Sequence, residues 1–435
     1  MRLGEAFAFP NVRERWRGTS VRSRLVAAGL AAALVTALVV SVLGRGGAEE
    51  PTNTAAAANT ACGYDNRVAG NPLLAGGHAP GGVVAVVPPG TIPAIDHPRF
   101  ESPAAARGWL GPKAPVVVAR VGTQVRAYPA AILLWHEVVN DVVGGLPLLV
   151  TFCPLCNTAM VYERVIRGRA HELEVSGELA LGAAVLYDRS DGLRYAQPTG
   201  KPLGPATRAA DPLGLVQARP PSAAPRGEPK PLRWYPSDLM TLDQAAAANP
   251  NLVVLSRDTG YARDYGASPY GRIGKLGSRP SLYDGFVDTR LDPKTRLVGV
   301  VINKVPQAWL YDALRRERVR NDTLGGKPVV ILFREDTASI ADSRNLAAAP
   351  AVGSAGVFSP TVDGRALHLE LGGDGQISDW ETGSSWDLTG RATSGPLAGT
   401  RLTPLPHLDT YWYAWAGRYP DTRVWPPLPP GCSGR

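Results

Sequence analysis

Apolar and polar positions alternate most regularly between residues 115 and 152, and the pattern there predicts strands. Residues 116–121 and 124–128 are rich in apolar and β-branched side chains and are separated by Gly122, which is typical of a hairpin. Residues 146–152, LPLLVTF, are almost continuously apolar and predict a buried strand. This part of the chain is therefore expected to form a sheet.

A short helix is expected between these strands. Pro129 suits the first turn of a helix, and we expect this helix to end at Val139. Its apolar face follows the spacing i, i+3, i+4, i+7 and consists of Ile132, Trp135, His136 and Val139. Residues 140–145, NDVVGG, are expected to form a turn before the buried strand.

Strands outweigh helices in the remaining pattern as well. Residues 159–166 and 169–175 flank an Arg-Gly turn and predict a second hairpin. The expected fold class is α+β and mainly β, with mixed sheets and a few short helices.

The sequence repeats itself once over a long period. NDVVGGLPLLVTFCPLCNTA from Asn140 aligns with NDTLGGKPVVILFREDTASI from Asn321, an offset of 181. Farther along, VYERVIRGRAHELE from Val161 resembles VFSPTVDGRALHLE from Val357. A unit of this length is too long for a solenoid repeat. We therefore expect two related lobes that arose by internal duplication.

The N-terminus predicts a membrane anchor. Residues 25–43, LVAAGLAAALVTALVVSVL, contain no charge and are long enough to nearly cross the ~30 Å hydrocarbon core of a bilayer. Arginines crowd residues 1–24, which the positive-inside rule makes a cytoplasmic tail. The segment is favoured as an uncleaved signal anchor over a cleaved signal peptide. The expected protein is single-pass in the cell membrane, with its C-terminal region extracytoplasmic.

The remaining boundaries follow composition. Residues 44–61 are a low-complexity tether, and residues 62–267 form the first lobe, with a proline-rich loop at 201–231. Residues 268–435 form the second, degenerate lobe.

Charge and motifs exclude several function classes. The net charge of +8 comes half from the basic tail, so the rest of the chain lacks the dense basic patch that nucleic-acid binding requires. Phosphate-binding glycine loops, the serine-hydrolase elbow and the zincin helix motif do not occur in the sequence.

The candidate chemistry lies in the pair Cys153 and Cys156, just after the predicted strand. A C-x-x-C pair can form a reversible disulfide, supply two ligands to zinc or copper, or serve as a structural staple. In a thioredoxin-like protein such a pair opens a helix, whereas here it is expected to connect two strands. The second lobe has Arg334 and Thr337 at these positions, so the same turn is expected to form without cysteines. This difference favours a functional pair over a staple.

Several neighbours could support the thiols. His136 is a candidate base or metal ligand, although a histidine on an apolar helix face is often only a core residue. The other candidate supporting residues, each with an equally plain structural interpretation, are Glu137, Thr151, Thr158, Tyr187 and Asp188.

Cys62 and Cys432 bracket the region expected to fold. In an oxidising compartment they could form a disulfide that ties the ends together; two free cysteines are the alternative.

A family resemblance joins these observations. The segments GTIPAIDHPRF, VRAYPAAILLWHEVVND, GGLPLLVTFCPLCNTAMVYER, LYDRSDGLRYAQ and the stretch from residue 394 to 425 resemble the DUF3179 family of domains of unknown function. Members of that family are described as selenoprotein candidates, with selenocysteine in place of a cysteine of the TFCPLC motif. The resemblance implies redox or nucleophilic chemistry at Cys153 and Cys156.

The sequence thus predicts a membrane-anchored protein with thiol–disulfide or peroxide-type redox chemistry and an unidentified redox or protein partner. A zinc, copper or ligand site built from Cys153, Cys156 and His136 is the alternative, and a scaffold without chemistry is a third. No cofactor is required by the first hypothesis.

Overall fold

The computed structural model describes residues 83–203, 229–278, 280, 282–283 and 288–429. The predicted tail, anchor and tether, most of the proline-rich loop, and both Cys62 and Cys432 lie outside these residues. No helix among the described residues is long and apolar enough to span a membrane. The anchor and its extracytoplasmic orientation therefore stay predictions.

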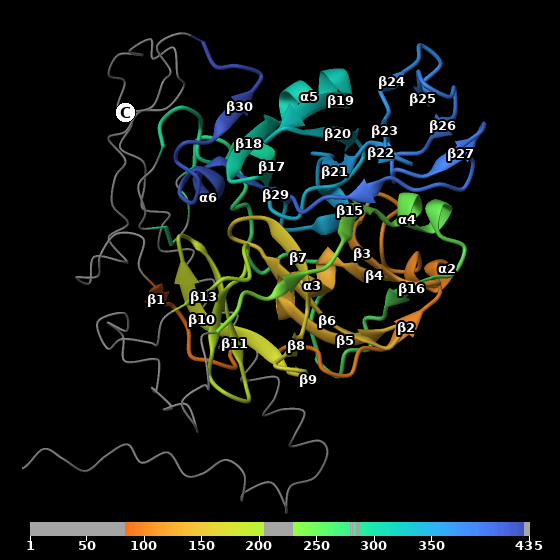
Figure 1. The fold of residues 1–435 in the computed structure, drawn as a ribbon. Coiled ribbons are helices and arrows are strands. Elements are labelled where there is room, and N and C mark those ends of the chain that lie inside the picture. Colours follow the sequence, from red (N-terminus) through yellow and green to blue (C-terminus); the bar gives the residue numbers. More distant parts are fainter. Residues whose placement is uncertain (1–82, 204–228, 279, 281, 284–287, 430–435) are drawn as a thin grey trace, which may run out of the picture. The chain divides into compact units, whose positions relative to one another are not determined.

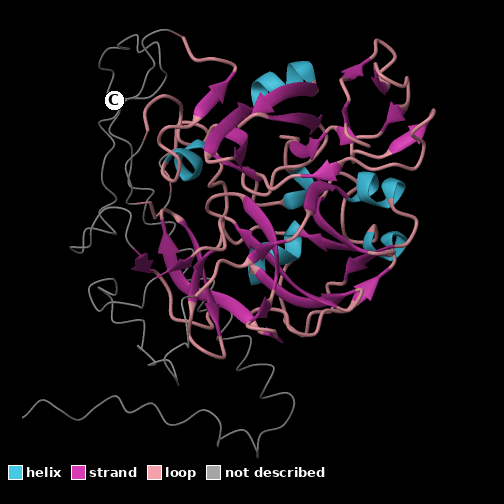
Figure 2. Ribbon diagram, viewed as in Figure 1, coloured by secondary structure: helices cyan, strands magenta, loops and turns pink. Residues whose placement is uncertain are grey.

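The architecture is mainly β with a few short helices, as the sequence predicts (Figure 2). In the first half of the described chain, three sheets lie around the helix α3 (Ala130–His136). The strands of the first sheet are, in order, β15 (Ser237–Thr241), β3 (Pro115–Val121), β4 (Gln124–Pro129), β16 (Leu252–Leu255) and β2 (Phe100–Glu101). Helices α2 (Pro103–Ala106) and α4 (Leu242–Ala248) belong to the same half.

The second sheet carries the cysteine motif. Its order is β14 (Arg233–Trp234), β7 (Thr158–Glu163), β6 (Leu146–Cys153) and β5 (Val138–Val143). The third sheet consists of β1 (Val83–Ala85), β10 (Leu173–Ala180), β11 (Ala183–Asp188), β12 (Arg194–Ala196) and β13 (Pro202–Leu203). A small hairpin of β8 (Val165–Ile166) and β9 (Arg169–Ala170) forms around the predicted Arg-Gly turn.

The second half repeats this series of elements (Figure 1). Five consecutive elements return at the offset of 181: β17 (Arg296–Ile302), β18 (Val305–Leu310), α5 (Tyr311–Glu317), β19 (Val319–Leu324) and β20 (Lys327–Arg334). The pairing partners return too, since β29 (Leu408–Tyr411) and β30 (Arg423–Trp425) flank β17 and β18 as β15 and β16 flank β3 and β4. Helix α6 (Trp412–Ala416) follows β29 as α4 follows β15.

The remaining strands complete the second half. One sheet is β19, β20, β21 (Ser354–Ser359) and β28 (Thr403–Pro404), and another is β24 (Leu369–Leu371), β25 (Ile377–Asp379), β26 (Ser385–Trp386) and β27 (Ala392–Ser394). The hairpin β22 (Thr361–Val362) and β23 (Arg365–Ala366) matches β8 and β9, and a 3₁₀ turn lies at Leu346–Ala348. The shared order of elements is a property of the structure; an origin by duplication stays a prediction.

The two halves pack into one compact unit rather than separate domains. Ile340 of the second half joins the apolar core around α3 and β6 in the first half. The dithiol turn therefore lies where residues from both halves can reach it.

One boundary of the sequence prediction is wrong. The helix ends at His136 instead of Val139, because Glu137 adopts a left-handed conformation with φ of 56°. Val138 and Val139 then pair with Thr151 and Val150, so the predicted turn at 140–145 is mostly strand and narrows to Gly144 and Gly145. β-branched residues favour this pairing over continuation of the helix.

Candidate functional site

The C-x-x-C motif is a tight turn between two buried strands. β6 ends at Cys153, β7 begins at Thr158, and these two residues are register partners across the pair. Asn157 closes the turn in a left-handed conformation with φ of 55°, which asparagine tolerates better than most residues. The turn brings the Sγ atom of Cys156 to 3.9 Å from the carbonyl oxygen of Cys153. The expectation of a pair between strands is confirmed. The expectation that the second half forms the same turn without cysteines is wrong, because residues 335–353 separate β20 from β21.

Both cysteines are free thiols and are buried. Burial raises the pKa of the Cys153 thiol well above its usual range, and the adjacent Cys156 sulfur raises it further. Burial alone would also raise the pKa of Cys156. The hydrogen bond from Cys153, the positive charge of Arg418 and the Thr158 hydroxyl together outweigh burial and lower that pKa. Cys156 is therefore the sulfur that ionises first, and Cys153 keeps its proton and donates it in a hydrogen bond.

The third sheet fixes the position of Cys153. The backbone N–H of Ala184, in β11, donates a hydrogen bond to the Sγ atom of Cys153 at 3.4 Å. Gln197 braces the same region: its backbone N–H donates to the Ala184 carbonyl at 3.0 Å, and its side-chain nitrogen donates to the Thr151 hydroxyl at 2.9 Å. Thr151 in turn donates to the carbonyl of Met160. Thr151 thus joins β6 and β7 to the third sheet.

The second half of the chain closes over the turn. The Thr410 hydroxyl in β29 donates to the Cys156 carbonyl at 2.9 Å and lies 3.1 Å from the Thr158 hydroxyl, which also donates to the Cys156 carbonyl. The Tyr413 hydroxyl donates to the carbonyl of Leu155 at 2.8 Å. More than 250 residues separate these partners along the chain.

A buried lysine completes this part of the site. Lys294 precedes β17, where the Asp292 side chain accepts a hydrogen bond from its backbone N–H at 2.8 Å. The Lys294 Nζ atom lies 4.9 Å and 5.1 Å from the ring centroids of Tyr411 and Tyr413. Among the described residues this Nζ has no hydrogen-bond partner. Burial lowers the pKa of Lys294 to about 8, although the charge of Cys156 opposes the shift. Two aromatic faces and a nearby thiolate are what retain the ammonium form there.

A buried carboxyl, that of Glu137, is a further ionisable group near Cys153. Glu137 is buried at the end of α3, and its backbone carbonyl accepts a hydrogen bond from the Phe152 N–H at 2.8 Å, next to Cys153. Burial raises the pKa of Glu137 to about 8, and the charge of Cys153 adds to this effect. The hydroxyl of Tyr270 donates to its Oε1 atom, which opposes the shift. At neutral pH Glu137 is therefore largely a neutral acid.

His136, the candidate base, is engaged elsewhere. Its Nδ1 atom lies 2.8 Å from the Pro93 carbonyl, and its Nε2 atom lies 2.8 Å from the Tyr265 hydroxyl. A carbonyl only accepts, so Nδ1 carries the proton and Nε2 accepts from the tyrosine. Burial lowers the pKa of His136 to about 4. The structure thus puts Glu137, and not the imidazole before it, beside Cys153.

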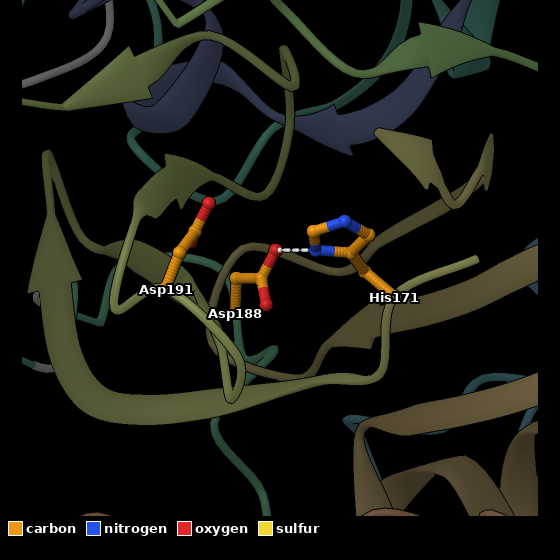
Figure 3. A group of neighbouring side chains, drawn as sticks. All are labelled: His171, Asp188 and Asp191. Atoms are coloured by element: carbon orange, nitrogen blue, oxygen red, sulfur yellow. Dashed lines mark hydrogen bonds and ion pairs between the residues drawn. The ribbon is translucent and has the colours of Figure 1, made fainter. Parts of the chain in front are cut away.

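Asp188 belongs to a second polar cluster, at the end of β11. The Nδ1 atom of His171 lies 2.5 Å from the Asp188 carboxylate, and Asp191 lies beside them (Figure 3). These are the one group of three potential metal-ligating side chains within the described ranges. Ser190 donates a hydrogen bond to Asp188, and Arg167 forms an ion pair with Asp191 at 3.5 Å, while the Asp191 Oδ2 atom has no hydrogen-bond partner among the described residues. Tyr187 lies in β11, where Glu174 and Arg194 are its register partners on the neighbouring strands.

The cysteine-based metal site is not assembled in the described part of the chain. A thiolate zinc or copper centre needs further ligands within a few ångströms of both sulfurs. Among the described residues, neither His136 nor any other histidine or carboxylate side chain forms a cluster of potential ligands with both Cys153 and Cys156.

Sequence reasoning missed the groups from the second half: Lys294, Thr410, Tyr413 and Arg418. One signal for Lys294 was available, because Lys113 precedes it by the repeat offset of 181. A lysine at a repeated position is ordinarily a solvent-facing residue, which is what Lys113 is.

The comparisons with known proteins agree with the sequence resemblance. No curated protein and no solved structure matches the chain. One family model, described as a protein of unknown function, matches residues 89–422, which include all of the groups around the thiols. The chain therefore belongs to the DUF3179 family.

Proposed function

We propose that the protein is a redox protein whose Cys153–Cys156 pair cycles between a dithiol and an internal disulfide. The observation that carries this proposal is geometric: two free, buried thiols share one tight turn, with the Cys156 Sγ atom 3.9 Å from the Cys153 carbonyl oxygen. The Ala184 N–H holds the Cys153 sulfur, and the lowered pKa of Cys156 beside the raised pKa of Cys153 agrees with a thiolate and a resolving thiol. A thiolate and a resolving thiol in contact are the two components that such a cycle requires.

The oxidation half-reaction balances within this site. An oxidant removes two electrons from the pair, the Cys153 and Cys156 sulfurs form one bond, and the Cys153 proton is released. In the reduction half-reaction an external dithiol attacks the Cys156 sulfur, and Cys153 leaves as a thiolate. Glu137 can then donate its proton to Cys153, because its pKa of about 8 keeps it protonated at neutral pH. The second thiol of the reductant then attacks the reductant sulfur of this mixed disulfide, the bond to Cys156 breaks, and Cys156 leaves as a thiolate. The reductant departs as a disulfide, and one of the two protons that it releases returns to Glu137.

The metal-binding alternative is not favoured by the arrangement of ligands, and a scaffold role does not account for the ionisable groups. A lysine and a glutamate, both buried next to a thiol pair, are costly unless they serve the chemistry there. We keep the membrane anchor at residues 25–43 as part of the proposal, supported by its uncharged length and the arginines before it.

Thiol counting tests the proposal. The reduced full-length protein is treated with diamide, alkylated, and examined by mass spectrometry, with metal analysis on the same sample. We expect loss of two thiols and one disulfide-linked peptide containing Cys153 and Cys156, with little bound metal. Cys153→Ser and Cys156→Ser should each prevent the disulfide, whereas Thr337→Ser at the aligned position should not.

Two outcomes would overturn the proposal. One is a pair that stays reduced under every oxidant while one equivalent of zinc or copper is bound. The other is a disulfide that is closed as purified and resists excess dithiol, because that is the behaviour of a staple.

A further inference from the structure

The enclosure of the dithiol limits what can oxidise it. Both sulfurs are at most 1% exposed, and β11, Thr410 and Tyr413 close around the turn from three elements. An in-line attack requires the partner's reacting atom to meet the Cys156 sulfur directly. A disulfide within another folded protein cannot approach that closely without opening the seam between the halves. A small molecule is the better fit.

We infer that, given the proposed dithiol function, the oxidising substrate is a small hydroperoxide, and that Lys294 is the acid that protonates its departing oxygen. The inference rests on a buried ammonium that has no hydrogen-bond partner among the described residues. It lies 5.1 Å from the ring centroid of Tyr413, whose hydroxyl binds the cysteine turn at Leu155. The leaving group decides between substrate classes. A thiol leaving group has a pKa near ~8.5 and departs as an anion, whereas a hydroxide or alkoxide has a conjugate acid near ~16 and needs a proton. An acid near the thiol pair is useful for the reduction of a peroxide and nearly superfluous for disulfide exchange.

The steps balance as follows. The Cys156 thiolate attacks the terminal oxygen of ROOH, the O–O bond breaks, and RO⁻ takes a proton from the Lys294 ammonium to leave as ROH. Cys156 is then a sulfenic acid. The Cys153 thiol attacks that sulfur, its proton leaves with the hydroxyl group as water, and the disulfide forms. An external dithiol restores both sulfurs, and one of the protons that it supplies returns to the Lys294 amine.

The repeat provides a matched control inside the same chain. Lys113 precedes β3 as Lys294 precedes β17, at the offset of 181. Its Nζ atom is 2.8 Å from the Asp336 carboxylate in the segment after β20, and both side chains are 60% exposed. A lysine thus precedes the equivalent strands β3 and β17, but of these two lysines Lys294 alone is buried and has no hydrogen-bond partner among the described residues.

The acid role predicts a pH profile. The groups that face Lys294 from the surrounding elements are Asp292, Arg296, Tyr411, Tyr413, Cys153 and Cys156. The tyrosine pKa values are raised by burial, so the tyrosines stay neutral in the working range. The peroxide rate should rise with pH as Cys156 ionises and fall above about 8 as Lys294 loses its proton.

The test compares two rates on each reduced full-length protein. One is the rate of oxidation by hydrogen peroxide, and the other is the rate of alkylation by iodoacetamide, which needs the thiolate but no acid. In Lys294→Met we expect the ratio of the peroxide rate to the alkylation rate to fall on the order of 100-fold, with loss of the decline above pH 8. Lys294→Arg keeps the positive charge but is a far weaker acid, so its ratio should also fall. Lys113→Met should match the parent protein.

Each of the following results would refute part of the proposal. An unchanged ratio in both Lys294 variants, with alkylation slowed, would limit Lys294 to electrostatic support and refute the acid role. Oxidation of the parent protein by diamide but not by hydrogen peroxide would refute the substrate class and leave the dithiol function intact. Failure of every oxidant to close the disulfide would refute both.

Discussion

The two halves of this protein end equivalent strands differently: residues 154–157 link β6 to β7 in a tight turn, whereas residues 335–353 link β20 to β21. Cys153 and Arg334 end equivalent strands, β6 and β20, and are both fully enclosed. Arg334 fills its site with hydrogen bonds to the Leu239 and Leu388 carbonyls and to the Asp238 carboxylate. Cys153 makes weak sulfur contacts to Ala184 and Cys156. Arg334 is held by strong hydrogen bonds and an ion pair where the chain leaves for a long connection, whereas the tight turn after Cys153 is held mainly by backbone carbonyl contacts.

Arg334 and Cys156 are each contacted by a strand from the other half. β15 of the first half supplies Asp238 and Leu239 to Arg334, and its counterpart β29 of the second half supplies Thr410 to Cys156. Even the first residue of the next strand is comparable, since Thr158 contacts Cys156 and Ser354 contacts Thr337 at 2.9 Å. The second half is thus more than a degenerate copy: it holds its own strand end through an ion pair and completes the site of the first.

The largest expected difference between these two strand ends is in stability. Arg334→Met would leave the Leu239 and Leu388 carbonyls and Asp238 without their donor, so the free energy of unfolding should fall by about 3–5 kcal/mol. Cys153→Ala removes one buried sulfur and should cost only about 1 kcal/mol. Denaturant unfolding of both variants measures these two losses of stability. Equal losses would mean that the cysteine turn is as structural as its counterpart.

That contrast also shows where sequence reasoning reaches its limit. The strand at 146–152, the hairpin around Gly122 and the correspondence of Cys153 with Arg334 are local patterns or alignments, and the structure has all three. The helix end at His136 depends on the left-handed Glu137 and on pairing of Val138 with β6, which local periodicity does not register.

Sequence reasoning identified the two cysteines at the centre of the site but not the groups from the second half, for a related reason. The sulfurs are adjacent in sequence, but their charge partners are brought in by packing of one half on the other, more than 100 residues away along the chain. His136 and Glu137 differ by one position, and only the turn of the backbone between them decides which side chain lies beside Cys153.

The pH dependence of stability should distinguish Lys294 from its counterpart Lys113. The pKa of Lys294 falls from 10.5 in the unfolded chain to about 8, so its contribution to stability is complete above 10.5 and is lost as the pH falls through 8. This difference corresponds to about 3 kcal/mol. Lys294→Met should therefore be more stable than its parent below pH 8, by up to that amount, and nearly equal to it near pH 10.5.

Unfolding free energies across this pH range provide the measurement. The Cys156→Ser background removes the coupled titration of the thiolate, so the remaining slope belongs to the amine. Lys113→Met should change stability by less than about 1 kcal/mol at every pH, because its ion pair is exposed. A pH-independent difference for Lys294→Met would show that its amine is not desolvated as the structure has it.

The smallest expected effect separates the hydroxyls of Thr158 and Ser354. Thr158→Val removes the hydroxyl whose hydrogen bond lowers the pKa of Cys156, so that pKa should rise. Ser354→Ala removes the bond to Thr337 and should leave thiol titration unchanged, while it costs about 1 kcal/mol of stability. The pH dependence of iodoacetamide alkylation measures the first effect, and denaturant unfolding measures the second. If both variants moved the alkylation curve alike, the halves would be coupled through the seam and not merely packed against each other; if neither did, the acidity of Cys156 would rest on Cys153 and Arg418 alone.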